Sequence, residues 1–265
     1  MAKNLLSEVM MKAEKSVQKS FLNTEELIDK IQYGYIAKRG PKHQQKKSFA
    51  PSTIAFSHGE CPRYWYLAFE GGTFQDNADA YGGANMTSGT YSHERIQKAM
   101  EDAGILKDAE FKVTWDDPPI FGYGDVILDW GGEDLLGEIK TMPMEGFEYR
   151  KKSGKPKTGH LIQLLIYMRI LNKTKAVLIY ENKNNHDLLI IPVEANDYHK
   201  RWVSDAFDWM KTVRQAWEDK KLPTKNYRSN SKICKTCPIR EICDEAGQGD
   251  IQIQSLEPLD ETKAL

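Results

Sequence analysis

The chain has 265 residues, of which 40% are hydrophobic and 28% are charged, which is the composition of an ordinary globular protein. Its 37 Lys and Arg residues nearly balance 38 Asp and Glu residues, so a uniformly basic, histone-like protein is excluded, although binding of nucleic acid through a local basic patch is not. No apolar run is as long as a transmembrane helix, and Lys12, Glu14 and Lys15 interrupt any signal-type stretch, so we expect a cytoplasmic protein without a membrane partner.

The first part of the chain, residues 1–49, is predicted to be a helical and then basic extension. Asn23, followed three positions later by Glu26, has the pattern of a capping box and predicts an amphipathic helix that ends near Ala37. The run at 38–47, KRGPKHQQKK, contains basic residues and no acidic ones, as is typical of a solvated linker.

The middle of the chain, residues 50–245, is predicted to be the folded core, and residues 246–265 an acidic, flexible or loosely docked tail. Residues 50–72 predict two short helices. The further predicted elements are a helix at 88–103, strands at 110–115, 121–130 and 133–142, a helix at 158–171, strands at 176–182 and 188–194, and a helix at 196–220. This order predicts an α/β (α+β) fold, in which a mixed sheet is flanked by helices.

Charged side chains interrupt two of the predicted strands. Glu138 and Lys140 lie two positions apart on one strand and therefore share a face, which leaves the Ile139 carbonyl near the same edge. If the two strands pair about a Gly131-Gly132 hairpin turn, Asp125 lies directly opposite Glu138. Two adjacent carboxylates repel unless a cation lies between them, and oxygen ligands favour Mg²⁺ or Mn²⁺. Such residues are also common on a solvated sheet face, so the strands alone leave both interpretations open.

Four short motifs in chain order resemble one nuclease family. GYGDVILDW followed by GEIKT resembles the D…ExK core of the PD-(D/E)xK nucleases, the restriction-endonuclease-like superfamily. GTYSHE at 89–94 resembles the first-helix motif of the RecB-like branch, and QLLIY at 163–167 resembles its Q-x-x-x-Y motif. The resemblance implies a restriction-endonuclease-like fold and metal-dependent hydrolysis of DNA.

The resemblance also assigns roles to individual residues. It implies that Mg²⁺ or Mn²⁺ is held by His93, Asp125, Glu138 and the Ile139 carbonyl, and that Lys140 positions the attacking water and stabilises charge. Gln163 and Tyr167 are four positions apart on one helix face, where they reach a DNA strand or order the Lys140 end of the site. We expect the catalytic set to be Lys140, Glu138, Asp125, Gln163 and Tyr167.

The cysteines are split into one and three, with Cys61 far upstream of Cys234, Cys237 and Cys243. Four thiolates bind either zinc or an iron–sulfur cluster, and spacing alone does not decide between them. The pattern, in CPRYWY and CKTCPIREIC, resembles the CRISPR-associated RecB-like exonucleases and the AddB-type nucleases, which implies a [4Fe–4S] cluster. We expect this cluster to be a structural staple between the two ends of the core.

A second basic segment, YRKKSGKPKTG at 149–159, is predicted to be a loop beside the site. We expect phosphate contacts from its basic residues, namely Arg150, Lys151, Lys152, Lys155 and Lys157. Tyr64, Trp65 and Tyr66 are interpreted as packing around the cysteines rather than as base-stacking residues.

The predicted function is that of a metal-dependent DNA exonuclease acting on single-stranded ends, in recombination and repair, phage DNA processing or CRISPR adaptation. Protein partners in recombination or CRISPR adaptation are part of this expectation. The first alternative is a DNA-end-binding adaptor without catalysis, stabilised by a metal cluster. The second is a structural protein stapled by zinc.

Overall fold

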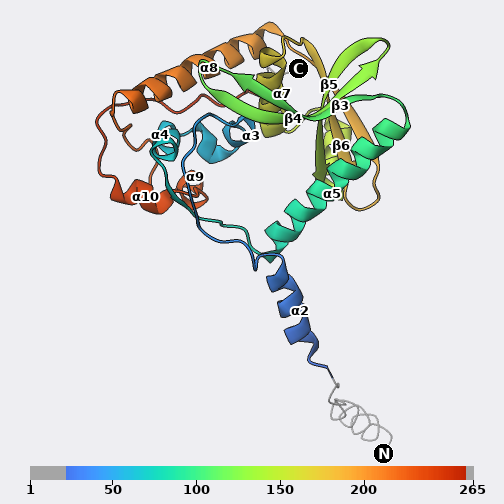
Figure 1. Cartoon of the computed structure of the whole chain (residues 1–265), viewed down its shortest axis with the longest axis horizontal. Coiled ribbons are helices and arrows are strands. Elements are labelled where there is room, and N and C mark those ends of the chain that lie inside the picture. Colours follow the sequence, from blue (N-terminus) through green and yellow to red (C-terminus); the bar gives the residue numbers. More distant parts are fainter. Residues whose placement is uncertain (1–21, 261–265) are drawn as a thin grey trace, which may run out of the picture. The chain divides into compact units, whose positions relative to one another are not determined.

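The computed structural model describes residues 22–260 (Figure 1). Its helices are α2 (Thr24–Gly34), α3 (Pro51–Ile54), the 3-10 helix η1 (Ser57–Glu60), α4 (Pro62–Glu70), α5 (Ala80–Asp102), α6 (Met144–Ser153), α7 (Thr158–Ile170), α8 (Asp197–Glu218), α9 (Lys232–Lys235) and α10 (Arg240–Glu245). Its strands are β1 (Lys42–Gln44), β2 (Gly72–Phe74), β3 (Leu106–Trp115), β4 (Ile120–Trp130), β5 (Glu133–Met142), β6 (Lys175–Asn182) and β7 (Leu188–Glu194). Within this described part, no helix is long and apolar enough to cross a membrane.

The chain divides into two compact units, of which the smaller contains the residues up to Arg39 together with Ala78–Ala84. Its helix α2 begins as predicted, because the Asn23 side chain accepts a hydrogen bond from the Glu26 amide at 3.3 Å. The helix ends at Gly34, and all of its side chains are exposed. The part of the predicted extension at residues 1–21 lies outside the described residues.

The larger unit is built on a five-stranded sheet with the order β3-β4-β5-β6-β7. Neighbouring strands are antiparallel except for β5 and β6, which are parallel and are joined by a crossover through α6 and α7. Gly131 and Gly132, at φ 66° and 84°, form the turn between β4 and β5. Val126 pairs with Gly137, so Asp125 and Glu138 are the next residues to oppose each other, as the glycine turn predicted.

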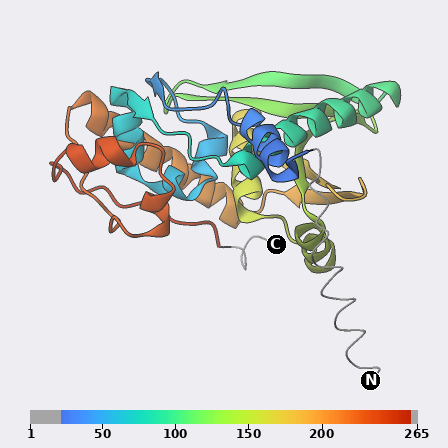
Figure 2. The same ribbon diagram turned by 90° about the horizontal axis from the view of Figure 1, so that it is seen from below.

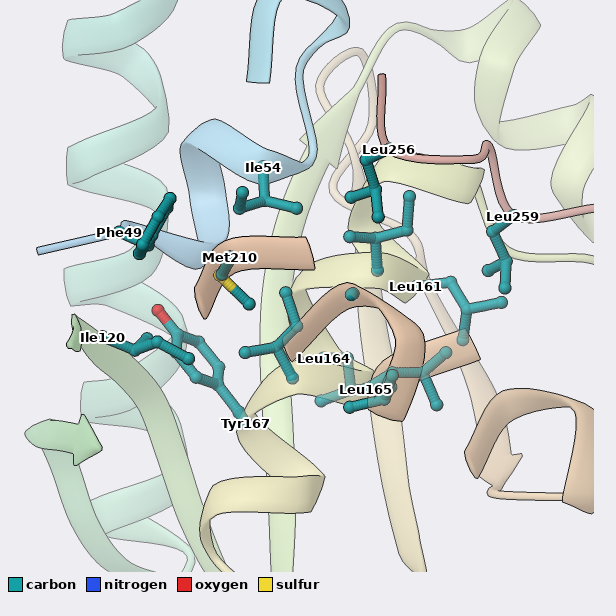
Figure 3. Close-up of a cluster of buried hydrophobic side chains, with 14 of the residues drawn as sticks. Phe49, Ile54, Ile120, Leu161, Leu164, Leu165, Tyr167, Met210, Leu256 and Leu259 are labelled. Atoms are coloured by element: carbon teal, nitrogen blue, oxygen red, sulfur yellow. The ribbon is translucent and has the colours of Figure 1, made fainter. Parts of the chain in front are cut away.

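Helices cover the sheet unequally. The main core lies on the face that packs against α7 and α8, and Figure 3 shows Leu164, Leu165 and Tyr167 of α7 beside Met210 of α8. On the other face, Ile96 of α5 packs on a smaller cluster. Figure 2 shows α5 running beside the long β3–β4 hairpin. This arrangement brings side chains of α5 to the middle of β4.

Two segments predicted to be irregular are ordered. The basic run at 38–47 contains β1, which pairs with β2, so it is not wholly a linker. The expected loop at 149–159 begins inside α6, whose end is marked by Gly154 at φ 66°. Arg150, Lys151 and Lys152 therefore lie in a last helical turn, where cations are favoured by the helix dipole.

The acidic C-terminal segment is docked up to residue 260, which corresponds to the docked one of the two predicted alternatives. Ile253, Leu256 and Leu259 are buried in the main core. The Trp202 indole donates to the Glu257 carbonyl at 2.9 Å, and the Leu256 amide donates to the Glu60 carbonyl at 2.9 Å. The apolar residues follow neither helical nor strand periodicity, and for that reason the sequence pattern concealed their burial.

Candidate functional site

Two buried carboxylates meet in the middle of the sheet, one on β4 and one on β5. Asp125 Oδ2 accepts a hydrogen bond from the Ile139 amide at 2.7 Å, which fixes the carboxylate against the neighbouring strand. Glu138 is fully buried, and Lys140 donates to its Oε1 atom. Burial raises the pKa of both carboxyl groups, and the Asp125 charge raises that of Glu138 further.

One oxygen of Glu138 lacks a hydrogen-bond partner among residues 22–260. Its Oε2 atom is buried without a hydrogen bond to any residue of the described chain. An unsatisfied buried carboxylate oxygen costs free energy, so its presence requires a compensating group. A bound divalent cation would satisfy this atom and also separate the Asp125 and Glu138 charges.

Helix α5 brings further ligands to the site. His93, Glu110 and Asp125 each offer a ligand atom, and these atoms lie within 4.8 Å of one another. His93 Nδ1 is 3.8 Å from Asp125 Oδ1. One helical turn later, the side-chain amide of Gln97 donates from Nε2 to Glu110 Oε1 at 2.9 Å and to the Asp125 backbone carbonyl at 3.1 Å. Helix α5 thus supplies one potential ligand, His93, and a hydrogen-bond donor, Gln97, that holds Glu110 and Asp125 in place.

The sequence analysis missed Glu110. It lies on β3 opposite Asp125, because Ala109 pairs with Val126 and Phe111 with Gly124. Its φ of 50° is in the left-handed region, which a residue with a Cβ seldom adopts inside a strand. The strands predicted at 110–115 and 121–130 are neighbours, and continuing their register would have placed Glu110 beside Asp125. Its left-handed backbone conformation carries no sequence signal.

The residues fit a hard divalent cation. A histidine nitrogen and carboxylate oxygens of Glu110 and Asp125 converge, and Mg²⁺ and Mn²⁺ prefer such donors. Glu138, across from Asp125, adds a buried oxygen that has no hydrogen-bond partner among the described residues. The structure brings His93, Asp125, Glu138 and Lys140 into one site, together with Glu110, and the Ile139 amide contacts the site through Asp125.

Gln163 and Tyr167 lie in the core beside this site. Both are buried, and burial raises the pKa of the Tyr167 hydroxyl above its usual range. A Cβ atom on Gly122 would lie 2.5 Å from that hydroxyl oxygen, so β4 passes close against Tyr167. Their burial favours a role in ordering the strands of the site over direct contact with DNA.

The basic residues of α6 and the following segment differ in their exposure. Lys151, Lys152 and Lys157 are exposed and Lys155 is half-buried. Arg150 donates to the Pro156 carbonyl at 3.0 Å and so holds the segment in place. The Lys157 amide donates to the Tyr180 hydroxyl at 3.1 Å, which ties the segment to β6. Lys151, Lys152 and Lys157 are therefore the members of the set that are exposed for phosphate contacts.

The four cysteines line one cavity of about 40 Å³, although Cys61 precedes the others by most of the chain. This space exceeds the roughly 10–15 Å³ that one water needs. Burial raises the pKa of Cys61 to about 11 and that of Cys237 to about 12, so these thiols are protonated without a cation beside them. Tyr64, Trp65 and Tyr66 are buried, in agreement with their interpretation as packing residues.

A buried arginine contacts the cysteine cavity. Arg63 is 1% exposed, and its Nε donates to Cys243 Sγ at 3.2 Å. Its other hydrogen bonds go to carbonyl oxygens, those of Pro223 at 2.8 Å and Gly247 at 2.7 Å among them. Carbonyl groups do not neutralise a buried cation, whereas thiolates bound to a metal centre do. The cavity therefore fits an anionic cysteine-ligated centre.

Comparison with solved structures shows the fold. The chain is similar to an alkaline exonuclease from Laribacter hongkongensis, with a TM-score of 0.50 and 15% identity, covering 71% of this chain and 95% of that chain. LHK-Exo in complex with dAMP gives a TM-score of 0.48 and 15% identity, covering 65% of this chain and 89% of that one. The structure of SSO0001 gives a TM-score of 0.43 and 15% identity, covering 84% of this chain and 96% of that one.

The similarity to the alkaline exonuclease agrees with the predicted fold class. The protein has a mixed α/β, restriction-endonuclease-like fold with a five-stranded sheet flanked by helices. No protein-family model matches the sequence, and no curated protein does.

Proposed function

We propose that the protein is a metal-dependent DNA exonuclease of the RecB-like PD-(D/E)xK type. The observation that carries this proposal is the pair of buried carboxylates, Asp125 and Glu138, beside Lys140, in which one Glu138 oxygen has no partner in the described chain. The fold shared with an alkaline exonuclease agrees with it. Single-stranded ends are the proposed substrate, and recombination, phage DNA processing or CRISPR adaptation the proposed setting.

Asp125 and Glu138 would hold Mg²⁺ or Mn²⁺, with His93, Glu110 and the Ile139 carbonyl as further ligands. The cation, when bound, supplies Lewis-acid stabilisation of the scissile phosphate and lowers the pKa of a water. The Ile139 amide keeps the Asp125 carboxylate oriented. Lys140, partly exposed and paired with Glu138, would orient the attacking water and stabilise negative charge on a phosphate oxygen.

The cysteine cavity is proposed to hold a [4Fe–4S] cluster. Cys61, Cys234, Cys237 and Cys243 would be its ligands, and the Arg63 cation supports an anionic centre there. Iron and sulfide analysis of anaerobically purified protein tests this assignment. About four of each per chain is expected, whereas stoichiometric zinc without iron would refute it.

The nuclease proposal is tested with end-labelled single-stranded DNA and Mn²⁺. Wild-type protein is expected to shorten the DNA from an end, and Lys140→Met and Asp125→Asn are expected to abolish this while melting like the wild type. Lys98→Met, at an exposed α5 site paired with Glu101, is the matched control and should cut normally. DNA binding without cleavage by the wild-type protein would instead identify a DNA-end-binding adaptor.

A further inference from the structure

The outer face of the β3–β4 hairpin carries two exposed aromatic rings. A Cβ atom on Gly122 would lie 2.5 Å from the Tyr167 hydroxyl, and one on Gly124 would lie 2.2 Å from the Phe111 ring, so these two positions face packed side chains. Side chains alternate along a strand, and Phe121 and Tyr123 therefore point the other way. They are 39% and 46% exposed.

The two rings form a pair. Their centroids are 5.3 Å apart, with an interplanar angle of 84°. On the neighbouring strand, Thr114 pairs with Phe121 and Lys112 with Tyr123, and both of these β3 residues are exposed. The face therefore combines aromatic surface with a cation, the two features that single-stranded nucleic acid requires of a binding surface.

The aromatic pair lies close to the proposed metal site along strand β4. Asp125 is two residues beyond Tyr123 on β4, a distance of about 7 Å along an antiparallel strand. Glu110 is two residues before Lys112 on β3 and lies opposite Asp125. A strand of DNA lying along β4 would thus meet the aromatic pair two residues before Asp125.

We propose that Phe121 and Tyr123 stack on the bases of single-stranded DNA next to the scissile phosphate, with Lys112 contacting a backbone phosphate. This inference rests on the proposed nuclease function and names the substrate class of that site. Unpaired bases expose the faces that the rings require, whereas the bases of a duplex are already stacked on one another. The hairpin would therefore select single strands, and it would do so without reading their sequence.

Binding without metal tests the aromatic face separately from catalysis. Labelled oligothymidylate and a duplex of equal length are titrated in EDTA and followed by fluorescence anisotropy. Phe121→Ala combined with Tyr123→Ala should weaken binding of the single strand about tenfold or more and leave duplex binding unchanged. Phe121→Trp combined with Tyr123→Trp should retain the affinity. Trp130→Ala, at a 65% exposed position near the hairpin turn, is the control and should bind like the wild type.

Substitution of the lysine gives a second readout. Lys112→Gln should lower the slope of log affinity against log salt concentration by roughly 0.7, the value expected for one phosphate of a single strand. Equal single-strand affinity of the double alanine variant and the wild type would overturn the proposal. The same holds if both ligands are weakened equally, because this would show general damage or an unselective surface.

Cleavage assays separate this inference from the nuclease proposal. If the wild type cuts single strands and the double alanine variant cuts them equally well below saturation, the aromatic face is refuted and the nuclease stands. The opposite outcome is that the wild type never cuts DNA but binds single strands, and that the double variant loses this binding. In that case the nuclease proposal is refuted and the single-strand binding surface stands.

Discussion

The Arg63 guanidinium donates from Nε to Cys243 Sγ at 3.2 Å in the interior of the protein. Its remaining donors reach carbonyl groups of the segment that carries Cys243 and of its neighbours, so a single side chain fixes α4 to the C-terminal part of the chain. Because hydrogen bonds to sulfur and nearby net charge set the potential of an iron–sulfur cluster, Arg63 is a positioning residue for the proposed centre.

Arg63→Met is expected to lower the free energy of unfolding by about 3 kcal/mol, because several buried carbonyl groups lose their donor. It should also shift the cluster potential to more negative values and speed loss of the visible absorption in chelator. Arg63→Lys, which keeps the charge, should restore part of the potential. Arg240→Met, beside the same cavity but paired with Asp244, is the control, and equal potentials in all variants would contradict the role.

The buried carboxylate of Glu138 predicts a pH-dependent stability of the metal-free protein. Its pKa is raised to about 8, so between about pH 4.3 and this value the folded state holds a proton that the unfolded state releases. Stability should therefore fall as the pH rises through this range, by more than about 1 kcal/mol, since one pKa unit corresponds to about 1.4 kcal/mol.

Denaturant unfolding in EDTA at several pH values measures this dependence. Glu138→Gln should flatten the curve, because its side chain does not ionise. Added Mn²⁺ should stabilise the wild type most at high pH, where the carboxylate is charged. A wild-type curve that is already flat between about pH 5 and pH 8 would show that Glu138 is ionised throughout.

Glu110 combines a potential ligand with an unfavourable backbone conformation. Glu110→Gln and Glu110→Gly should both weaken Mn²⁺ binding by about tenfold or more, since each removes the carboxylate. Glu110→Gly should be the more stable of the two by up to about 1 kcal/mol, because glycine adopts a positive φ without penalty. Calorimetric titration and denaturant unfolding measure the two effects. Glu133→Gln, at an exposed β5 position, should change neither quantity.

Lys151 and Lys152 are expected to contact phosphates of bound DNA. Changing both to Gln should weaken binding of a single strand and reduce its salt slope by about 1.4, which corresponds to two phosphate contacts. Titrations over a range of salt concentrations measure the slope. The control is Lys200→Gln, at a position already paired with Asp197, which should leave the salt slope as in the wild type. An unchanged slope in the double variant would show that α6 does not contact DNA.

The sheet and its register followed from the sequence because the signals were local. The paired glycines set the β4–β5 register, and alternation then placed Glu138 and Lys140 on one face. The site was less predictable where it depends on packing between distant elements. The Gln97 brace requires knowing how α5 crosses β3 and β4, and the position of Arg63 requires knowing where the C-terminal segment folds back.

Burial decided the cases in which sequence patterns failed. For Tyr167 the sequence left two roles open, contact with a DNA strand or ordering of the Lys140 end of the site, and its burial in the core favours the second. The apolar residues of the C-terminal segment were concealed among acidic ones, and Leu256 and Leu259 are buried all the same. Helix α6 was obscured because its basic last turn looks like part of a charged loop.

The position of Arg63 in the chain has a consequence for synthesis. Its hydrogen-bond partners lie 160 to 185 residues downstream. At ribosomal rates of about 5–20 residues per second, these partners are synthesised roughly 8–37 s after α4. During this interval the Arg63 guanidinium has none of its native hydrogen-bond acceptors, and Cys61 is present without the other three cysteines. Loading of the proposed cluster would therefore wait until Cys243 has been synthesised. A product truncated before Cys234 would keep an unpaired arginine and a single cysteine in place of the buried centre.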